Sequence, residues 1–312
     1  MNDRQSPAGG EPPYAVYIGD VALDEYYRTP RWPSAADKVE VETLEAVPGG
    51  MIANAACVYA SLGGTVRFVT VLRHSPITTF LLEDLEKAGV DVSMTIYDDS
   101  LPDSRTMIFL CGDEHTVFIP ELHLKEIPLK EEDLAVLKGA RYIYSTVGNL
   151  RLLTCGGRRW PELAPEIRAA GARVVVDYDV DYERDGDCER FRQVDIGFFN
   201  ETGFDSVREG RSYEDTVRWL RELGMGTVVV TLAEKGCRIY DGEAVYVLPA
   251  FPTEVVDVTG AGDTFCSTFI ALLDEYGPEK AGIMANAAAS RCVSAMGARA
   301  GAVGKEEVLR LI

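Results

Sequence analysis

Residues 257–265 read Asp-Val-Thr-Gly-Ala-Gly-Asp-Thr-Phe and combine a turn almost without side chains with a carboxylate at its edge. A ligand can approach the backbone closely at Gly260, Ala261 and Gly262, and an apolar helix begins directly after them. The first N–H groups of a helix attract anions such as phosphate. Asp263 stands where a carboxylate can take the proton of a hydroxyl that attacks this phosphate. The pattern therefore predicts a phosphoryl-transfer site, against the simpler interpretation that Asp263 only caps the helix.

Charge and composition narrow the kind of protein further. With 312 residues, 46% of them hydrophobic, the chain has room for one large globular domain or two ordinary ones. Fifty acidic residues against 31 basic ones give a net charge of −19, which repels nucleic acids and anionic membranes, so we expect neither as a partner. The seven cysteines form no C-x-x-C pair, and the three histidines show no metal-ligand spacing. These features predict a cytoplasmic protein with reduced thiols, preceded by a flexible tail at residues 1–13.

Two carboxylates follow the first predicted strand, residues 14–18. Asp20 and Asp24 come directly after it, at the end of the strand where open α/β sheets bind their ligands. Ordinary solvation of a loop explains either residue taken alone. We therefore treat the pair as a candidate binding site that needs support from the rest of the chain.

A small-residue helix with an internal asparagine is predicted next. Residues 39–47 alternate apolar and polar side chains, which predicts a half-exposed strand, and Gly49 and Gly50 then lead into a helix over 51–61. Asn54 lies inside that helix. Asparagine is a middling helix former, so a hydrogen-bonding role is plausible, with a solvent-facing side chain as the alternative.

Three further strands are predicted before residue 120, at 92–97, 106–110 and 116–120, the last two joined as a hairpin. Together with the strand at 39–47 they predict a small sheet with no helix over one face. Such a sheet needs a role as a lid or a partner subunit, and we expect both. The lid strands are thus drawn from about residues 21–47 and 92–120.

From about residue 130 strands and helices alternate strictly. Strands are predicted at 142–147, 173–177, 196–200 and 227–232, with the clearest helix at 213–223 and a hairpin at 238–247. This alternation predicts an α/β fold with a doubly wound parallel sheet. The acids of residues 177–181 fail the pattern of a calcium loop, because Tyr182 and Cys188 stand where Gly and Glu are needed, and we expect them at the carboxyl end of a strand.

With these motifs in place, the chain resembles the ribokinase-like (PfkB) sugar kinase family from Tyr14 to its C-terminus. Residues 257–265 are similar to the C-terminal signature of that family, and Gly49-Gly50, Asn54-Ala55-Ala56 and Leu62-Gly63-Gly64 are similar to its N-terminal one. The resemblance implies a single Rossmann-like kinase domain over residues 14–312 with a β-sheet lid that often forms a homodimer. It also implies transfer of the ATP γ-phosphate to a hydroxyl, usually of a sugar, with Mg²⁺.

The resemblance also implies roles for individual residues. Asp263 is then the catalytic base, and the amides of Gly260, Ala261 and Gly262 form the anion hole. The substrate hydroxyls are held by Asp20, Asp24, Gly49, Gly50 and Asn54. The nucleotide is bound by Asn200, Thr231, Gly236 and Asn286, the last of which lies where the family packs residues against adenine. A monovalent cation, K⁺ in particular, is bound near Asp257 and the Thr259 carbonyl.

Three departures from the family pattern affect these roles. The Glu of the family's Asn-x-x-Glu motif is Gly203 here, so that positioning of the metal falls to Asn200, a neighbouring acid or water. Ala233 replaces a usual Gly, which is a mild change. Residues 72–77 stand where Gly-x-Asp is expected, so ribose or fructose cannot be assumed as the substrate.

Two alternatives to a sugar kinase stay open. A nucleoside kinase is one, because Phe109, Phe118 or Tyr144 could supply an aromatic wall for a base. The other is a sensor that binds nucleotide without turnover, which the change at Gly203 permits. An intact Asp263 disfavours the sensor, since it would then have no task.

Overall fold

The buried apolar runs of the chain pair into a nine-stranded sheet with the order β17-β16-β15-β14-β13-β10-β1-β5-β6. The computed structural model describes residues 12–112, 114–178 and 188–312. Neighbouring strands from β6 to β15 pair in parallel, and the hairpin β16–β17 adds two antiparallel strands at one edge. The strands are β1 Tyr14–Ile18, β5 Thr65–Leu72, β6 Asp91–Tyr97, β10 Tyr142–Thr146, β13 Arg173–Asp177, β14 Ile196–Asn200, β15 Thr227–Thr231, β16 Cys237–Asp241 and β17 Ala244–Leu248.

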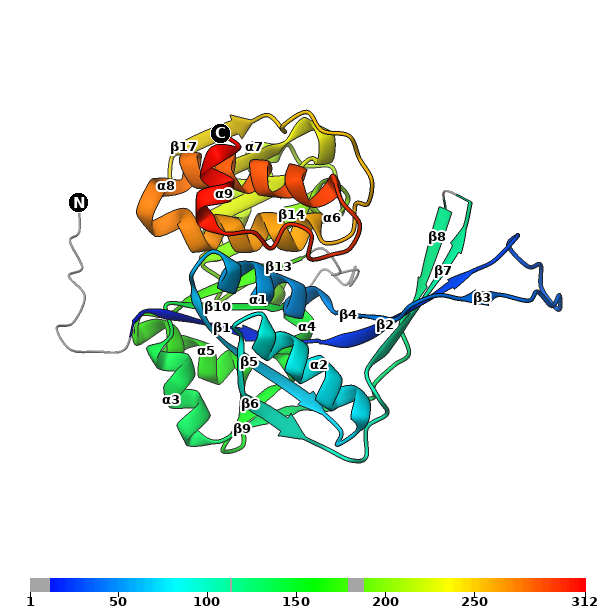
Figure 1. Ribbon diagram of the computed structural model, residues 1–312. Coiled ribbons are helices and arrows are strands. Elements are labelled where there is room, and N and C mark those ends of the chain that lie inside the picture. Colours follow the sequence, from blue (N-terminus) through cyan, green and yellow to red (C-terminus); the bar gives the residue numbers. More distant parts are fainter. Residues whose placement is uncertain (1–11, 113, 179–187) are drawn as a thin grey trace.

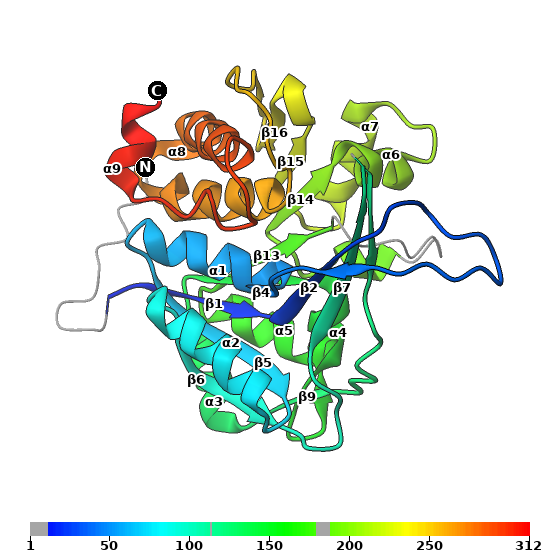
Figure 2. The same cartoon turned by 45° about the vertical axis from the view of Figure 1, so that its right-hand side comes forward.

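Helices cover both faces of this sheet, as Figures 1 and 2 show. Alternate residues of β1 belong to different cores: Tyr17 packs with α1, α2 and α8, whereas Val16 packs with the helices of the opposite face. The expected doubly wound α/β fold is thereby confirmed. The helices are α1 Met51–Ser61, α2 Pro76–Lys87, α3 Glu131–Gly139, α4 Val147–Leu152, α5 Trp160–Ala169, α6 Glu201–Arg208, α7 Tyr213–Glu222, α8 Ala261–Val293 and α9 Lys305–Arg310.

Helix α8 is interrupted, and its first half matters most here. Gly277 has non-helical backbone angles and Pro278 follows it, so the helix is kinked at this point. The first half packs beside α1 at the centre of the molecule (Figure 1). The N-termini of α1 and α8 therefore lie close to each other.

The strand order reverses around β1, which lies between β5 and β10. After β1 the chain forms β5 on one side of it and later β10 on the other side. The carboxyl ends of β1, β5 and β10 therefore border a crevice. Asp20, Asp177, Asn200 and Thr231 all stand at or directly after the carboxyl ends of parallel strands. The fold thus gathers them at one edge.

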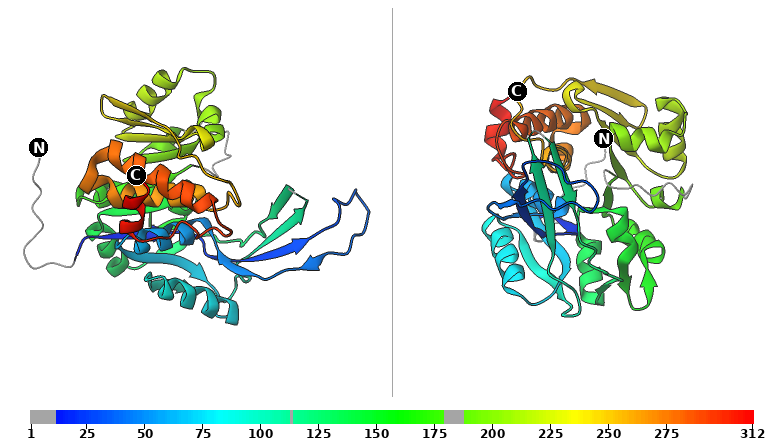
Figure 3. Two further views of the ribbon diagram at one scale, coloured as in Figure 1. Left: turned by 45° about the horizontal axis from the view of Figure 1, so that its top comes forward. Right: turned by 90° about the vertical axis from the view of Figure 1, so that its right-hand side faces the viewer.

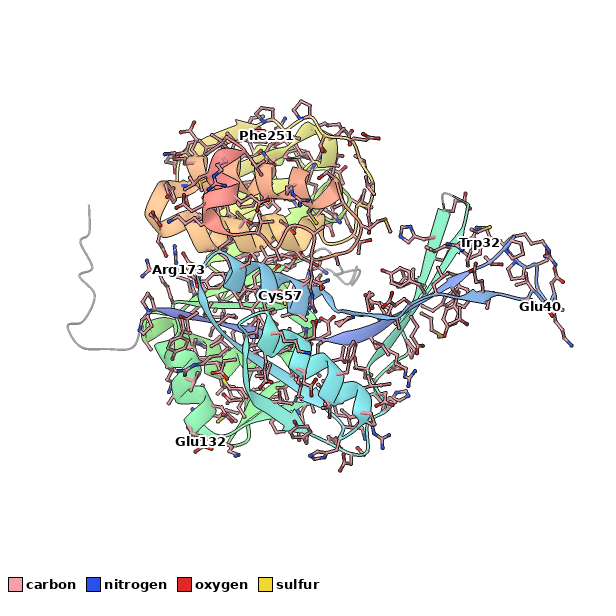
Figure 4. All side chains as sticks on the ribbon, in the orientation of Figure 1. Trp32, Glu40, Cys57, Glu132, Arg173 and Phe251 are labelled. Carbon is pink, nitrogen blue, oxygen red and sulfur yellow. The ribbon has the colours of Figure 1, made fainter. Side chains whose placement is uncertain are left out.

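A smaller sheet projects from this edge (Figure 3). Its order is β3-β2-β7-β8, and β4 also pairs with β2. The tip of the projection carries Trp32 and Glu40 far from the body (Figure 4), and Trp32 Nε1 donates a hydrogen bond to Glu114 at 2.8 Å. The strands are β2 Ala22–Arg28, β3 Glu42–Thr43, β4 Val47–Gly49, β7 Arg105–Cys111 and β8 Glu114–Phe118. We call these five strands and the loop 29–41 the lid.

The lid differs from the prediction in three respects. The strand at 92–97 is β6, which pairs in parallel with β5 in the large sheet and not with the lid. Residues 22–28, which fall in the region 21–47 expected to supply lid strands but were given no strand of their own, form the central lid strand β2. The single strand predicted over 39–47 is two short strands, because the pairing with β2 shifts by one residue between Thr43 and Val47, as at a β-bulge.

One more short sheet, β12-β11-β9, lies beside α5. Its strands are β9 Ile127–Leu129, β11 Leu153–Cys155 and β12 Arg158–Arg159. In the described part of the chain, no helix is long and apolar enough to cross a membrane. Of the acids predicted at the end of a strand, Asp177 ends β13, whereas residues 179–187 lie outside the described residues.

Candidate active site

The turn before α8 adopts a conformation that only glycine tolerates at one position. Gly260 is the N-cap of the helix with a φ of 76°, and a Cβ built on it collides with the backbone carbonyl of Ala298. By contrast, a Cβ at Gly262 meets nothing within 4 Å. Gly260 is thus required by the fold, whereas the space beside Gly262 is open for a ligand.

Not all three predicted amides are free. The Ala261 N–H donates to the Val258 carbonyl at 3.3 Å, a long bond within the turn itself. The N–H groups of Gly260 and Gly262 have no backbone acceptor among the described residues. The expected set of three donors is therefore corrected to two, with Ala261 as part of the turn that presents them.

Asp263 lies in the first turn of α8, and its side chain is 9% exposed. Asn54 Nδ2, from α1, donates a hydrogen bond to Asp263 Oδ2 at 3.3 Å. Asn54 is itself buried, so the alternative of a solvent-facing asparagine is wrong. The two helices thus bring the predicted base and one predicted substrate residue into direct contact.

Asp20 stabilises the start of α1. The N-cap of that helix is Gly50, which has no side chain, and Asp20 Oδ2 accepts a hydrogen bond from the Met51 N–H at 3.0 Å in its place. Burial raises the pKa of Asp20, and the amides of Met51 and Ile52 oppose that effect. Gly50 has a φ of 99° and passes close to Val21, which leaves no room for a side chain.

Asp24 lies on β2, where the lid leaves the body, and not in a loop after β1. Its carboxylate packs against Gly49 so closely that a Cβ there would collide with it. Burial, followed in effect by the neighbouring carboxylate of Asp20, raises the pKa of Asp24 to about 6, against a hydrogen bond from Thr106 that lowers it. Around neutral pH, Asp24 is therefore a buried carboxylate, and the hydrogen bond from Thr106 offsets only part of the free-energy cost of burying its charge.

Because the charged form of Asp24 is buried, ionisation of this side chain should lower the free energy of unfolding. The folded protein holds the Asp24 proton to a higher pH than the unfolded chain, so the free energy of unfolding falls between about pH 4 and pH 6 and the loss persists above pH 6. The difference between 3.8 and about 6 corresponds to roughly 3 kcal/mol at most. Urea denaturation of Asp24→Asn should show a gain in stability at about pH 7.5 that shrinks towards about pH 4.

The matched control is Asp98→Asn. Asp98 is partly exposed, and its hydrogen bonds from Ser100 lower its pKa, so this variant should gain no stability at either pH. A gain for Asp24→Asn that is the same at both pH values would contradict the assignment of a raised pKa.

A cavity of about 820 Å³ lies at the carboxyl edge of the sheet, on the other side of Asp263 from α1. All four predicted nucleotide residues, Asn200, Thr231, Gly236 and Asn286, line it. Ala261, Gly262 and Asp263 line it as well, so the turn forms one end of the cavity. Apolar side chains and the chain after β17 form the other part, including Phe251, Pro252, Val255 and Val258.

Two of the nucleotide residues also hold the walls of this cavity. The Asn286 Nδ2 group donates to the carbonyls of Leu248 at 3.3 Å and Pro249 at 3.1 Å. Gly236 has a φ of 94°, and a Cβ there would collide with the Leu248 carbonyl. Both residues therefore fix the chain that follows β17 against the mouth of the cavity.

The altered Asn-x-x-Glu motif begins α6. Asn200 caps this helix, with its Oδ1 atom accepting from the Gly203 N–H at 2.6 Å. The motif therefore lacks a carboxylate at Gly203 but keeps its cap. Asp177 and Glu201 also line the cavity, and sequence reasoning assigned neither to the site.

Asp177 was expected at the carboxyl end of a strand, and the rule that open α/β sheets bind ligands there could also have assigned it to the site. It ends β13, is 5% exposed and accepts a hydrogen bond from the Tyr144 hydroxyl at 2.8 Å. Glu201 forms an ion pair with Lys235 at 3.2 Å. Glu201 directly follows Asn200, so it is the neighbouring acid that the sequence analysis considered for positioning the metal.

Asp257 connects two loops around the catalytic turn. Its Oδ1 atom accepts from the Thr259 N–H and its Oδ2 atom from the Gly297 N–H, both at 2.9 Å. Although burial acts to raise the pKa of Asp257, these amides outweigh it and lower the pKa. The Thr259 carbonyl accepts from Cys292 Sγ at 3.5 Å. Both residues offered for a monovalent cation thus have partners within the protein.

The aromatic residues proposed as a wall for a base lie apart from one another. Tyr144 is fully buried in the core beside Tyr17, so it cannot face a ligand, and this expectation is wrong. Phe109 stacks on Tyr27 in the lid, with ring centroids 5.0 Å apart, and meets Phe118 edge to face. Of these three residues, Phe109 and Phe118 in the lid are the ones that can face a ligand.

The residues present fit Mg²⁺ as an ion carried by the nucleotide. Among the described residues, no group of three or more His, Cys, Asp or Glu side chains could hold a metal by itself. Mg²⁺ is usually held by phosphates, waters and one or two carboxylates, and Asp177 and Glu201 supply carboxylates in the cavity. The donor set is that of a nucleotide-dependent site.

Comparison with known proteins identifies the family. Residues 13–303 match the pfkB family of carbohydrate kinases, and the chain belongs to that family. It is 25% identical over 313 residues to a probable fructokinase-5 from Arabidopsis thaliana, covering 92% of this chain and 93% of the relative. It is 30% identical over 299 residues to the bifunctional protein HldE of Azotobacter vinelandii, covering 90% of this chain and 60% of the relative.

Solved structures show the same fold. Ribokinase from Arabidopsis thaliana, determined with ribose and ATP, superposes with a TM-score of 0.81 at 24% identity, covering 96% of this chain and 98% of the other. A nucleoside kinase from Methanocaldococcus jannaschii superposes with a TM-score of 0.76 at 19% identity, covering 97% and 99%. The large sheet and the smaller lid sheet are thus those of the ribokinase fold.

Proposed function

We propose that this chain transfers the γ-phosphate of ATP to a hydroxyl of a sugar or sugar-like acceptor. The observation that carries the proposal is the position of Asp263. It lies at the end of the nucleotide-sized cavity, beside the open amide of Gly262, and contacts Asn54 of the acceptor cluster. Among the relatives named above, fructokinase and ribokinase act on sugars, which supports this acceptor class.

The nucleotide occupies the cavity with its base against the apolar wall and its phosphates towards the catalytic turn. The apolar part near Phe251 and Val255 suits a base, and the polar ends of β14 and β15, with Asn200 and Thr231, lie between it and the turn. The Gly260 and Gly262 amides, at the positive end of the α8 dipole, then stabilise negative charge on the transferred group.

The acceptor lies on the other side of Asp263, under the lid. Asp24 and Asn54 bind its hydroxyls, and Gly49 and Gly50 allow it to approach the backbone. Asp20 acts mainly by holding the start of α1. Above about pH 6, Asp24 is a carboxylate and accepts hydroxyl hydrogens.

In the reaction, the acceptor oxygen forms a bond to the γ-phosphorus as the bond to the bridging oxygen of ADP breaks. The hydroxyl proton passes to Asp263, and Asn54 holds that carboxylate in place. When bound with the nucleotide, Mg²⁺ neutralises phosphate charge, and Asp177 and Glu201 are the residues we propose to hold its waters. Closure of the lid excludes water from the phosphate.

The proposal has three further features. K⁺ binds near Asp257 and the Thr259 carbonyl and stiffens the turn. The lid pairs with a second copy of the chain, supported by its exposed residues Val117 and Phe118 and by Ile119 directly after β8. The protein works in the cytoplasm, supported by seven cysteines that are all free thiols.

An ADP-release assay with a panel of sugars and nucleosides tests the function. ATP, Mg²⁺ and K⁺ are supplied with pentoses, hexoses, sugar phosphates and nucleosides in turn. At least one sugar should raise ADP release well above the rate without acceptor, with a phosphomonoester as the product. Turnover with nucleosides alone supports a nucleoside kinase, for which Phe109 and Phe118 in the lid offer a stacking surface.

Silence across the whole panel, together with saturable ATP binding measured by calorimetry, supports the sensor and overturns the kinase.

A further inference from the structure

Arg299 lies in the loop between α8 and α9, far in sequence from the acceptor residues, and no expected role covers it. The same loop touches the catalytic turn twice, because the Gly297 N–H donates to Asp257 and the Ala298 carbonyl packs against Gly260. This loop, residues 294–300, thus forms the back wall of the turn.

The Arg299 guanidinium joins two helices. Its Nε–H donates to Asn54 Oδ1 at 3.0 Å, and its Nη1 group forms an ion pair with Asp84 of α2. Asn54 is 5% exposed, so this contact is within the protein interior. Arginine has only donors, and the contact therefore assigns the oxygen of the Asn54 amide to the side of Arg299.

That assignment determines what Asp263 receives. With its oxygen turned to Arg299, Asn54 must present its NH₂ group to Asp263, as the 3.3 Å contact to Oδ2 shows. In the opposite orientation, the Asn54 amide oxygen would face the Asp263 carboxylate, and the Asn54 NH₂ group would face the N–H groups of Arg299. Arg299 thus selects one of two amide orientations that are nearly equal in shape.

We propose that Arg299 is a positioning residue for the reaction, which fixes the side-chain amide of Asn54 and through it the catalytic base Asp263. The inference rests on the proposed kinase function. The ion pair with Asp84 lies on the other side of the guanidinium, and the positioning contacts are those of Arg299 with Asn54 and of Asn54 with Asp263. A residue that acts in this way affects turnover more than nucleotide binding.

Arg299→Met is the first test, measured with the acceptor that the panel identifies. We expect kcat to fall about 10- to 100-fold, with the KM for ATP changed less than about threefold. Asp84→Asn is the matched control, because it removes the ion pair and leaves the Arg299–Asn54 bond. It should cost similar thermal stability but keep kcat within about threefold.

A double-mutant cycle separates positioning from a structural clamp. If Arg299 acts through Asn54, then Arg299→Met should have little further effect on kcat once Asn54 is replaced by Ala. Losses that multiply in the double variant overturn the proposal, and so does an Arg299→Met enzyme with full kcat. If Arg299→Met does not fold, Arg299→Lys takes its place: its single ammonium group keeps the charge beside Asp84 but lacks the fork that serves Asp84 and Asn54 together, so kcat should fall in the same way, and full kcat overturns the proposal.

One readout needs no turnover and so distinguishes failure of this inference from failure of the kinase assignment. In ¹H–¹⁵N spectra of the resting protein, the two side-chain N–H signals of Asn54 should be well separated and slow to exchange with solvent. Arg299→Met should bring them towards the values of an exposed asparagine, whereas Asp84→Asn should not. Unchanged Asn54 signals in Arg299→Met overturn the inference, whether or not an acceptor is found.

Discussion

Asp263→Asn is expected to lower kcat by about 10²- to 10⁴-fold while the Kd for ATP changes less than about threefold. Asparagine has the same shape as aspartate and can still accept the hydrogen bond from Asn54, but it cannot take the acceptor proton. The cavity that receives the nucleotide is otherwise unchanged, because Asp263 is only one of its lining residues. Steady-state kinetics for kcat and calorimetry for ATP measure the two effects separately.

The ATP affinity serves as the control for folding of this variant. A variant that binds ATP normally and turns over normally would remove Asp263 as the base. A variant that loses both properties together would assign Asp263 to the structure of the turn instead, which is the helix-cap interpretation.

Gly260→Ala is expected to abolish most of the activity and to lower the thermal stability. Its Cβ collides with the Ala298 carbonyl, and its φ of 76° is strained for any residue with a side chain, at a cost of about 1–3 kcal/mol for the backbone alone. The loop 294–300 must then move away from the turn, and Arg299 moves with it. We expect kcat to fall more than about 100-fold.

Gly262→Ala, two residues further along the turn, is the matched variant. Its Cβ meets no protein atom within 4 Å, and Ala favours the helix, so thermal stability should not fall. Activity should still decline, because the methyl group enters the space left for the phosphate. Equal losses of stability in the two variants, measured by thermal unfolding, would contradict the different roles given to these glycines.

Much of the fold follows from sequence patterns because its strands are buried on both faces. Runs such as 174–176 and 228–230 are apolar throughout and belong to strands that alternate with helices, which is typical of a parallel sheet. The lid lacks that signal. β2 mixes charged, aromatic and apolar side chains and is only partly buried beyond Asp24, so neither its bounds nor the bulge between Thr43 and Val47 is apparent in the sequence.

The placement of β6 was predictable but was missed. A strand, a helix and a strand in succession, here β5, α2 and β6, form the unit that pairs in parallel within one sheet. The prediction assigned residues 92–97 to the lid because the next two strands belong there.

Some residues of the candidate site were predictable from the sequence and others were not. Asp20, Asn200 and Thr231 were predictable because they stand at strand ends that the topology brings together. Arg299 was not, since its contacts with Asn54 and Asp84 join segments 245 and 215 residues apart and leave no local pattern. The bond that occupies the Ala261 amide likewise depends on the turn geometry and not on residue type.

The central claim is that the Gly260 and Gly262 amides hold the phosphoryl group during transfer. NMR of ¹⁵N-glycine-labelled protein tests it directly, comparing Mg·ADP with Mg·ADP plus aluminium fluoride and acceptor, where the fluoride stands in for the transferred group. The account predicts that the Gly260 and Gly262 amide protons move downfield when the fluoride is added, while Gly242 in the distant β16–β17 turn does not. Shifts at Gly260 and Gly262 no larger than that at Gly242 would contradict it.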